Sequence, residues 1–194
     1  MNAEKGYKLV DHARCHNELA RFALAVPFFD VVNGKVVCMD GFRLAIADIG
    51  APANFPPYET LIPKEYKVTV KVNVNELLMV ARSFATAKFT PPIVRINIKK
   101  DSLHFYTQNE GNPNMTAELK YEIESGDTAN VKVAINPKYL FECVKSLKVA
   151  SGKGLSITMS IGTPAQPIKF TTADYTEVVM PMFVRWENFK KDGN

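Results

Sequence analysis

The stretch Val131-Lys-Val-Ala-Ile-Asn-Pro-Lys-Tyr-Leu-Phe-Glu-Cys-Val-Lys-Ser-Leu-Lys148 passes from a strand pattern directly into a helix pattern. Residues 131–135 form a short apolar, partly β-branched run that is typical of a strand. Asn136 and Pro137 suit the N-cap and the first helical position. The apolar residues that follow recur at helical spacing and predict one buried stripe: Leu140, Cys143, Val144 and Leu147. The stretch therefore predicts a strand followed at once by an amphipathic helix that ends near Lys148.

The same order of strand, helix and meander is repeated along the chain. Residues 67–72 alternate between polar and apolar side chains, as in a strand with one solvent-exposed face. A helix over residues 75–87 follows, with Asn75 as its N-cap. An earlier copy has a helix over residues 11–23 and a hairpin turn at Asn33-Gly34. The meander strands cover residues 28–32, 35–38, 43–49, 93–98, 103–108, 115–124, 155–161, 168–172 and 176–182. Three such units predict an α+β fold whose helices all cover one side of antiparallel sheets.

Composition places the chain among ordinary folded proteins. Of its 194 residues 46% are hydrophobic and 23% are charged, which is too apolar for a disordered chain. No stretch approaches the roughly 20 continuous apolar residues of a membrane helix, and we expect no secretory signal. The three cysteines, Cys15, Cys38 and Cys143, lack C-x-x-C spacing, which favours a reducing cytosol over a disulfide scaffold or a zinc knuckle. The net charge of +4 permits a polyanionic partner without demanding one.

The histidines are the best candidates for chemistry, and they do not form a convincing site. His12 and His16 stand four residues apart with Cys15 between them, a spacing compatible with metal ligation. The Glu of an H-E-x-x-H motif is missing and no third ligand is near, so ordinary helix residues are the favoured interpretation. His104, beside Phe105, is typical of a sheet residue. We therefore expect no catalytic residues, no metal and no cofactor, and a protein that is not an enzyme.

Two apolar segments at strand ends stand out for another reason. They are Cys38-Met-Asp-Gly-Phe-Arg-Leu-Ala and Glu177-Val-Val-Met-Pro-Met-Phe, and the proline-rich segment Asn54-Phe-Pro-Pro-Tyr-Glu-Thr-Leu-Ile-Pro lies between them in sequence. One interpretation is that they are core strands and a turn. The other is a peptide groove, because Pro181 forces a strand edge or end, and flexible Met180 and Met182 adapt to varied ligands.

Four motifs, taken in order, resemble the bacterial DNA polymerase III beta subunit, the sliding clamp. They are Asp40-Gly-Phe-Arg-Leu-Ala, Phe55-Pro-Pro-Tyr…Pro63, Asn136-Pro-Lys-Tyr-Leu and Val178-Val-Met-Pro-Met, within a match over residues 21–183. The resemblance implies the DNA-clamp fold, a ring of helix-plus-meander units around duplex DNA, and a processivity role in DNA replication. The implied partners are double-stranded DNA, bound without sequence specificity, and DNA polymerase and clamp loader subunits, bound through linear motifs, in the cytoplasm.

The resemblance also implies two sets of site residues. The expected peptide-binding cleft consists of Leu24, Met39, Gly41, Phe42, Arg43, Leu44, Pro56, Thr60, Leu61, Val178, Val179, Met180, Pro181 and Met182. The expected DNA-facing residues are basic residues on the helices, which would meet phosphates without reading bases: Arg14, Arg21, Arg82, Lys138, Lys145 and Lys148. A plain solvated helix face is the alternative for this second set.

The chain departs from the family in several places. Phe42 replaces the family's His, Thr60 replaces an Arg, and Phe183-Val184 replaces a terminal Arg-Leu. Family chains have three domains and six units, whereas the resemblance implies for this chain half of the middle domain (residues 1–50), a linker (51–64), a complete last domain (65–184) and a tail (185–194). We therefore expect a homo-oligomer, a dimer or a tetramer. The alternative function is a clamp-derived adaptor or decoy that binds peptides without encircling DNA.

Overall fold

The computed structural model describes residues 3–14, 27–30, 34–49, 58–87, 90–108 and 114–186. Its helices are α1 (Ala3–Val10), α2 (Val74–Thr86) and α3 (Pro137–Ser151), with 3-10 turns η1 (Asp11–Ala13) and η3 (Tyr58–Leu61). The strands are β1 (Phe28–Asp30), β2 (Lys35–Met39), β3 (Arg43–Asp48), β4 (Val68–Asn73), β5 (Val94–Ile98), β6 (Ser102–Tyr106), β7 (Thr116–Gly126), β8 (Lys132–Ile135), β9 (Ser156–Ile161), β10 (Ile168–Thr171) and β11 (Tyr175–Val179).

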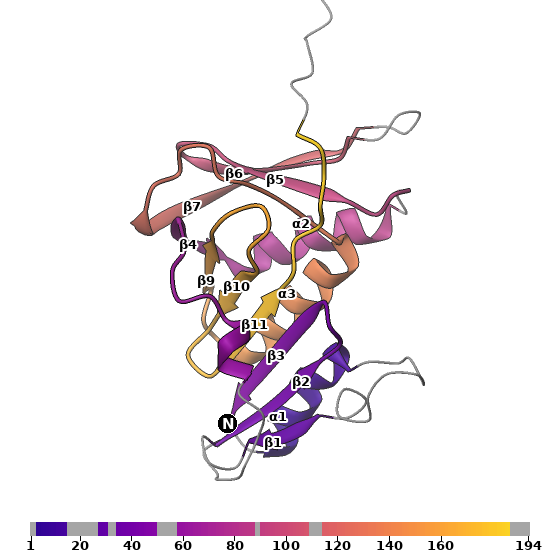
Figure 1. Cartoon of the computed structure of the whole chain (residues 1–194), viewed down its shortest axis with the longest axis vertical. Helices are drawn as coiled ribbons and strands as arrows, with labels where there is room; N and C mark the ends of the chain where they lie inside the picture. Colours follow the sequence, from indigo (N-terminus) through magenta and orange to yellow (C-terminus); the bar gives the residue numbers. More distant parts are fainter. Residues whose placement is uncertain are drawn as a thin grey trace, which may run out of the picture.

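All strand pairs described are antiparallel, and the strands follow the order β1-β2-β3-β11-β10-β9-β4-β7-β6-β5-β8. The last strand, β11, pairs with β3 from the opening unit, with Leu44 opposite Val178 and Arg43 opposite Val179 (Figure 1). This single pairing brings the two apolar segments of the sequence side by side.

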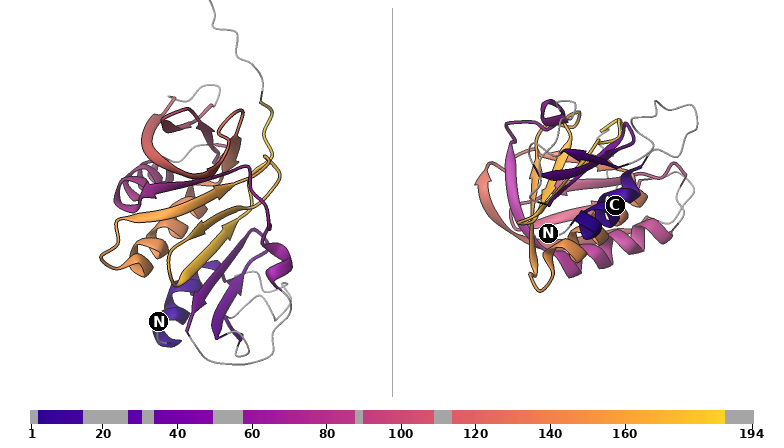
Figure 2. Two further views of the ribbon diagram at one scale, coloured as in Figure 1. Left: turned by 90° about the vertical axis from the view of Figure 1, so that its left-hand side faces the viewer. Right: turned by 90° about the horizontal axis from the view of Figure 1, so that it is seen from below.

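The three helices lie on one side of the strands, as Figure 2 shows from below. Helix α2 packs against α3, and α1 packs on β2 and β3. One continuous core joins the helices to the strands, with Leu77 of α2, Leu140 of α3 and Phe170 of β10 fully buried. The predicted α+β class, with helices on one side of antiparallel sheets, is confirmed.

The repeated unit is visible in the pairing of the strands. The order β4-α2-β5-β6-β7 is followed by β8-α3-β9-β10-β11, and the first strand of each unit pairs into the other unit, β4 with β9 and β8 with β5. The opening unit has α1 and then β1, β2 and β3. None of the described helices is long and apolar enough to cross a membrane.

The first helix lies earlier than the sequence predicts. The expected helix over residues 11–23 is wrong at its start, because α1 already begins at Ala3 and Arg14 has an extended backbone (φ −65°, ψ 136°) that ends η1. The true helix is only 8 residues long, and Gly6 lowers its helix propensity. That glycine is needed for packing, because a Cβ atom there would come within 2.6 Å of the Ile49 side chain. Residues 15–26, with the predicted stripe Cys15, Leu19 and Phe22, lie outside the described residues.

The N-cap of α2 is also shifted, from the predicted Asn75 to Asn73. The Asn73 side chain accepts hydrogen bonds from the backbone N–H groups of Asn75 (2.9 Å) and Glu76 (3.3 Å). We expect Asn73→Ala to lower the free energy of unfolding by about 1 kcal/mol, and Asn75→Ala to lower it by much less. Urea denaturation of both variants measures this, and a larger loss in Asn75→Ala would contradict the assignment.

Candidate functional site: the cleft between β3 and β11

A hollow of about 180 Å³ opens where β3 and β11 pair. We call it the β3–β11 cleft, and it is lined by Met39, Gly41, Phe42, Arg43, Leu44, Leu61, Pro167, Val178 and Met180. These residues come from the opening unit, from η3, from the connection between β9 and β10, and from the last strand. The cleft therefore depends on the long-range pairing of β3 with β11.

The floor of the cleft is buried and apolar, whereas its rim is exposed. Leu44 and Val178 are each 4% exposed and pack with Val37 and Ile46 in a small separate cluster. On the rim, Met180 is 40% exposed and Phe42 is 60% exposed. An apolar floor with exposed apolar edges can bury apolar side chains of a ligand.

A tight turn at residues 40–43 fixes the rim. Gly41 has a φ of +88°, a conformation that favours glycine. The Asp40 carboxylate accepts hydrogen bonds from the backbone N–H groups of Phe42 (3.0 Å) and Arg43 (2.9 Å). The Met180 N–H donates to the Phe42 carbonyl at 2.9 Å, which ties the turn to the closing segment. The Phe42 ring also stacks on Tyr139 of α3, with ring centroids 6.3 Å apart.

Arg43 is held from several sides. Its guanidinium donates to Asp40 (3.0 Å from Nε), to Glu142 of α3 and to the His12 carbonyl (2.8 Å), and it lies 4.3 Å over the Tyr139 ring. Burial works to lower the pKa of Arg43, but the carboxylates of Asp40 and Glu142 raise it overall. The charge of Arg43 is therefore neutralised within the protein, and the cleft offers a ligand mainly apolar surface.

The structure brings most of the expected cleft residues together, but not all of them. Val179 faces the main core with no exposed surface, because neighbours on a strand point to opposite faces. Pro181 and Met182 continue away from the cleft, and the Met182 N–H donates to the Ala134 carbonyl of β8 at 2.7 Å. Thr60 lies beside Leu61 on η3 but does not line the hollow. Leu24 and Pro56 lie outside the described residues.

Pro167 is the cleft residue that sequence reasoning missed. It precedes β10, and the pairing of Ile168 with Val179 carries it to the cleft beside Met180. No local motif marks this proline. Only the pairing register between β10 and β11 places Pro167 at the cleft.

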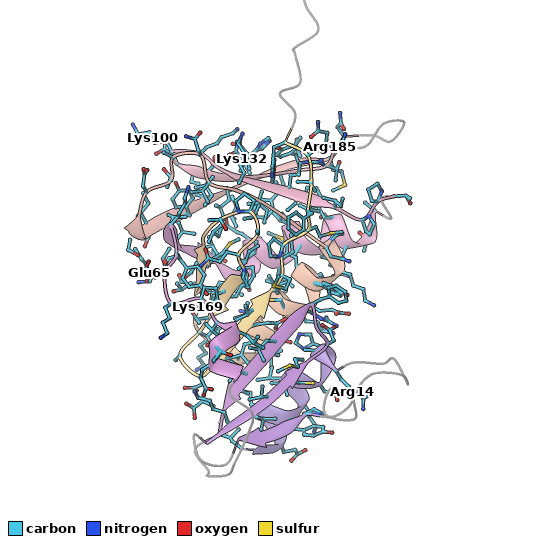
Figure 3. The ribbon with its side chains drawn as sticks, in the orientation of Figure 1. Arg14, Glu65, Lys100, Lys132, Lys169 and Arg185 are labelled. Atoms are coloured by element: carbon cyan, nitrogen blue, oxygen red, sulfur yellow. The ribbon has the colours of Figure 1, made fainter. Side chains whose placement is uncertain are left out.

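The expected DNA-facing residues lie on the helical side. Lys138, Lys145 and Lys148 are on α3 and Arg82 is on α2, while Arg14 follows η1 and can be seen in Figure 3. Arg21 lies outside the described residues. Lys145 also lines a wider cavity of about 630 Å³ between α1 and α3, together with Lys5 and Lys8 of α1. Sequence reasoning missed these two lysines because it placed the first helix too late.

The described histidines contact neighbouring side chains, and the described cysteines are buried. The His12 ring lies 3.0 Å from the Glu177 carboxylate, and His104 stacks on Tyr106. Burial raises the pKa of Cys38 to about 12 and raises that of fully buried Cys143 well above its ordinary value, so neither thiol is a ready nucleophile. His16 and Cys15 lie outside the described residues. Within the described ranges, no group of three or more His, Cys, Asp or Glu side chains is arranged to hold a metal ion.

Solved structures define the class of this fold as that of the beta sliding clamps. The clamp of Caulobacter crescentus matches with a TM-score of 0.79 and 15% identity, over 93% of this chain and 63% of that chain. The clamp of Pseudomonas aeruginosa matches with a TM-score of 0.78 and 15% identity, over 93% of this chain and 64% of that chain. The beta subunit of Thermotoga maritima matches with a TM-score of 0.72 and 18% identity, over 94% of this chain and 63% of that chain. The chain therefore spans less than two thirds of the length of these clamps.

Membership of a family follows from the sequence itself. A family model described as the C-terminal domain of the DNA polymerase III beta subunit matches residues 59–183, so the chain belongs to that family. The predicted resemblance is confirmed. A search of the curated proteins finds no significant match. Sliding clamps are not enzymes, in agreement with the expectation from the sequence.

Proposed function

We propose that this chain is a sliding-clamp-like processivity factor that binds short peptide motifs of replication proteins in the β3–β11 cleft and associates with double-stranded DNA through its helical side. The observation that carries the proposal is that Leu44 and Met180, from opposite ends of the chain, line one apolar hollow. The fold of the solved clamps supports it. The proposed partners are DNA polymerase and clamp loader subunits, and the proposed location is the cytoplasm.

The cleft suits a peptide with apolar anchors. Each Leu or Phe side chain that it fully buries contributes about 1.5–3 kcal/mol, and a few such anchors usually dominate the affinity of an interface. Arg43, whose charge is neutralised by Asp40 and Glu142, leaves apolar contact as the main source of affinity. A fluorescent peptide of the Gln-Leu-X-Leu-Phe type, titrated with the protein, tests this directly. Absence of saturable binding would contradict the proposed function.

The proposed DNA contacts are electrostatic. Lysines on α3 and α1 would meet phosphates, whose neutralisation releases counterions and makes affinity fall with salt. Lys8 already pairs with Glu4 at 2.6 Å, so part of this positive charge is compensated within α1. Because the contacts carry no base readout, we expect no preference for DNA sequence.

Charge reversal at α3 tests the helical side. We expect Lys145→Glu with Lys148→Glu to weaken DNA association and to lower the slope of log affinity against log salt by about two. The control is Lys100→Glu, which changes an exposed lysine at the opposite end of the molecule from Arg14 (Figure 3). An unchanged salt slope in the double variant would count against the DNA-facing assignment.

A peptide-binding adaptor or decoy that does not encircle DNA is the second candidate. The observation that favours it is the net charge of only +4, which is low for a protein that builds a channel around DNA. We propose that residues 1–50 are a half domain, 51–64 a linker, 65–184 a complete domain and 185–194 a tail. Self-association of half domains would complete them, and four chains would supply the twelve units of a ring.

Solution mass distinguishes the two candidates. A tetramer that remains on circular DNA and slides off linear DNA supports the clamp. A monomer or dimer that binds the peptide but is not retained on circular DNA supports the adaptor.

A further inference from the structure

The ring of His12 lies among three oxygen atoms, one of which is Ser146 Oγ at 3.3 Å from Nδ1. Its Nδ1 is 2.8 Å from the Leu9 carbonyl oxygen and its Nε2 is 3.0 Å from Glu177 Oε1. A carbonyl oxygen can only accept a hydrogen bond, so Nδ1 must carry a hydrogen to satisfy the first contact. The contact between His12 Nε2 and Glu177 Oε1 is then a hydrogen bond only if one of these two atoms carries a further proton.

The surroundings of Glu177 place that proton on His12. The side chain of Glu177 is fully buried, and its Oε2 accepts a hydrogen bond from the Tyr175 hydroxyl at 2.6 Å. The Cys143 thiol also interacts with it, so the carboxylate is surrounded by donors. With both ring nitrogens donating, His12 is an imidazolium paired with a buried carboxylate. If Nε2 lost its proton, the lone pair of this nitrogen would face the Glu177 carboxylate oxygen, and the hydrogen bond between them would be lost.

The pair is joined to the cleft by two routes. Glu177 precedes Val178 of the cleft floor on β11, and Arg43 donates to the His12 carbonyl at 2.8 Å. Arg43 in turn binds Asp40, whose carboxylate holds the turn of the cleft rim. The other titratable and charged groups around His12 come from α1, η1, α3 and β11: Glu4, Lys5, Lys8, Asp11, Arg14, Glu142, Cys143, Lys145 and Tyr175.

We propose that His12 and Glu177 are positioning residues of the β3–β11 cleft. A proton held between them docks α1 and η1 on β11 and α3, and this docking orders the rim through Arg43, so that peptide affinity falls as the pH rises. The effect on peptide affinity rests on the proposed function of the cleft, whereas the docking itself does not.

The direction of the pH effect follows from the raised pKa of His12. Burial works to lower this pKa, but the Glu177 charge and hydrogen bond raise it overall above 6.5. A raised folded-state pKa stabilises the folded chain fully below the unfolded value, and the stabilisation is lost as the pH rises through the folded-state value. The sensitive window therefore lies above pH 6.5.

The test measures peptide affinity and urea stability from about pH 6 to about pH 9. For the natural chain we expect both to fall, with the folding equilibrium constant changing by about tenfold for each pKa unit by which the folded-state value is raised. His12→Gln should remove the pH dependence of both, while His104→Gln on β6 should keep it. Identical pH profiles in His12→Gln and the natural chain would overturn the proposal.

A second measurement covers the case in which His12→Gln does not fold. Nuclear magnetic resonance of the imidazole nitrogens in the natural chain should show His12 titrating above pH 6.5, and Glu177→Gln should move that titration down. A His12 ring that titrates below 6.5 would overturn the proposal. If no peptide binds at any pH, the proposed function fails, and the stability profile still decides the docking.

Discussion

A Met180→Asp substitution should lower the affinity for a Gln-Leu-X-Leu-Phe peptide by at least about 100-fold and leave the fold intact. Met180 is 40% exposed on the rim of the cleft, so the new carboxylate can reach water in the free protein. A bound apolar anchor would take that water away, and burying an unpaired charge is costly. The lost apolar contact adds about 1.5–3 kcal/mol to the penalty.

Fluorescence anisotropy of a labelled peptide measures this effect, with circular dichroism as the check on folding. Met79→Asp is the matched control, because Met79 is 64% exposed on α2 and lies outside the cleft. Leu44→Asp should also abolish binding, although it changes a buried floor residue and will cost stability as well. Unchanged affinity in both cleft variants would remove the assignment of the site.

Arg43→Ala should lower the free energy of unfolding by about 3–5 kcal/mol, the loss expected when one partner of a buried ion pair is removed. The Arg43 side chain is 6% exposed and pairs with Asp40 and Glu142. Its removal leaves those carboxylates without their main partner and the His12 carbonyl without a donor. Urea denaturation at neutral pH measures the loss.

The control for this prediction is Lys71→Ala. Lys71 pairs with Glu124 at 2.8 Å, but both side chains are well exposed, so solvent screens the interaction. We expect the urea midpoint of this variant to stay close to that of the natural chain. If Arg43→Ala lost no more stability than Lys71→Ala, the ion pairs of Arg43 with Asp40 and Glu142 would not contribute substantially to the stability of the fold.

Local patterns predicted most of the fold. The strand before α3, the cap at Asn136 and the helix after it lie where periodicity placed them, because each feature is contained within a few neighbouring residues. The helix α1 was missed because it is only 8 residues long and contains Gly6, a residue of low helix propensity that is required by the close approach of Ile49. The N-cap of α2 was shifted because Asn73 and Asn75 are equally good caps in sequence, and the end of β4 decides between them.

The cleft was predictable only where motifs marked it. The segments around Asp40 and Met180 resemble known motifs, so the cleft residues they contain were expected. Pro167 and the pair of His12 with Glu177 have no such marker, since they meet through strand register and through helix docking between opposite ends of the chain. The burial of Glu177 is hidden in the sequence, because an acidic residue on an alternating strand ordinarily predicts an exposed face.

The most direct measurement of the central claim is a titration of methionine methyl resonances with the Gln-Leu-X-Leu-Phe peptide. Met39 and Met180 line the cleft, whereas Met79 is exposed on α2 and Met159 is fully buried on β9. We predict that the signals of Met39 and Met180 shift together and saturate, and that those of Met79 and Met159 stay in place. Signals of Met39 and Met180 that do not move while the peptide binds elsewhere, or no response at any peptide concentration, would contradict the account.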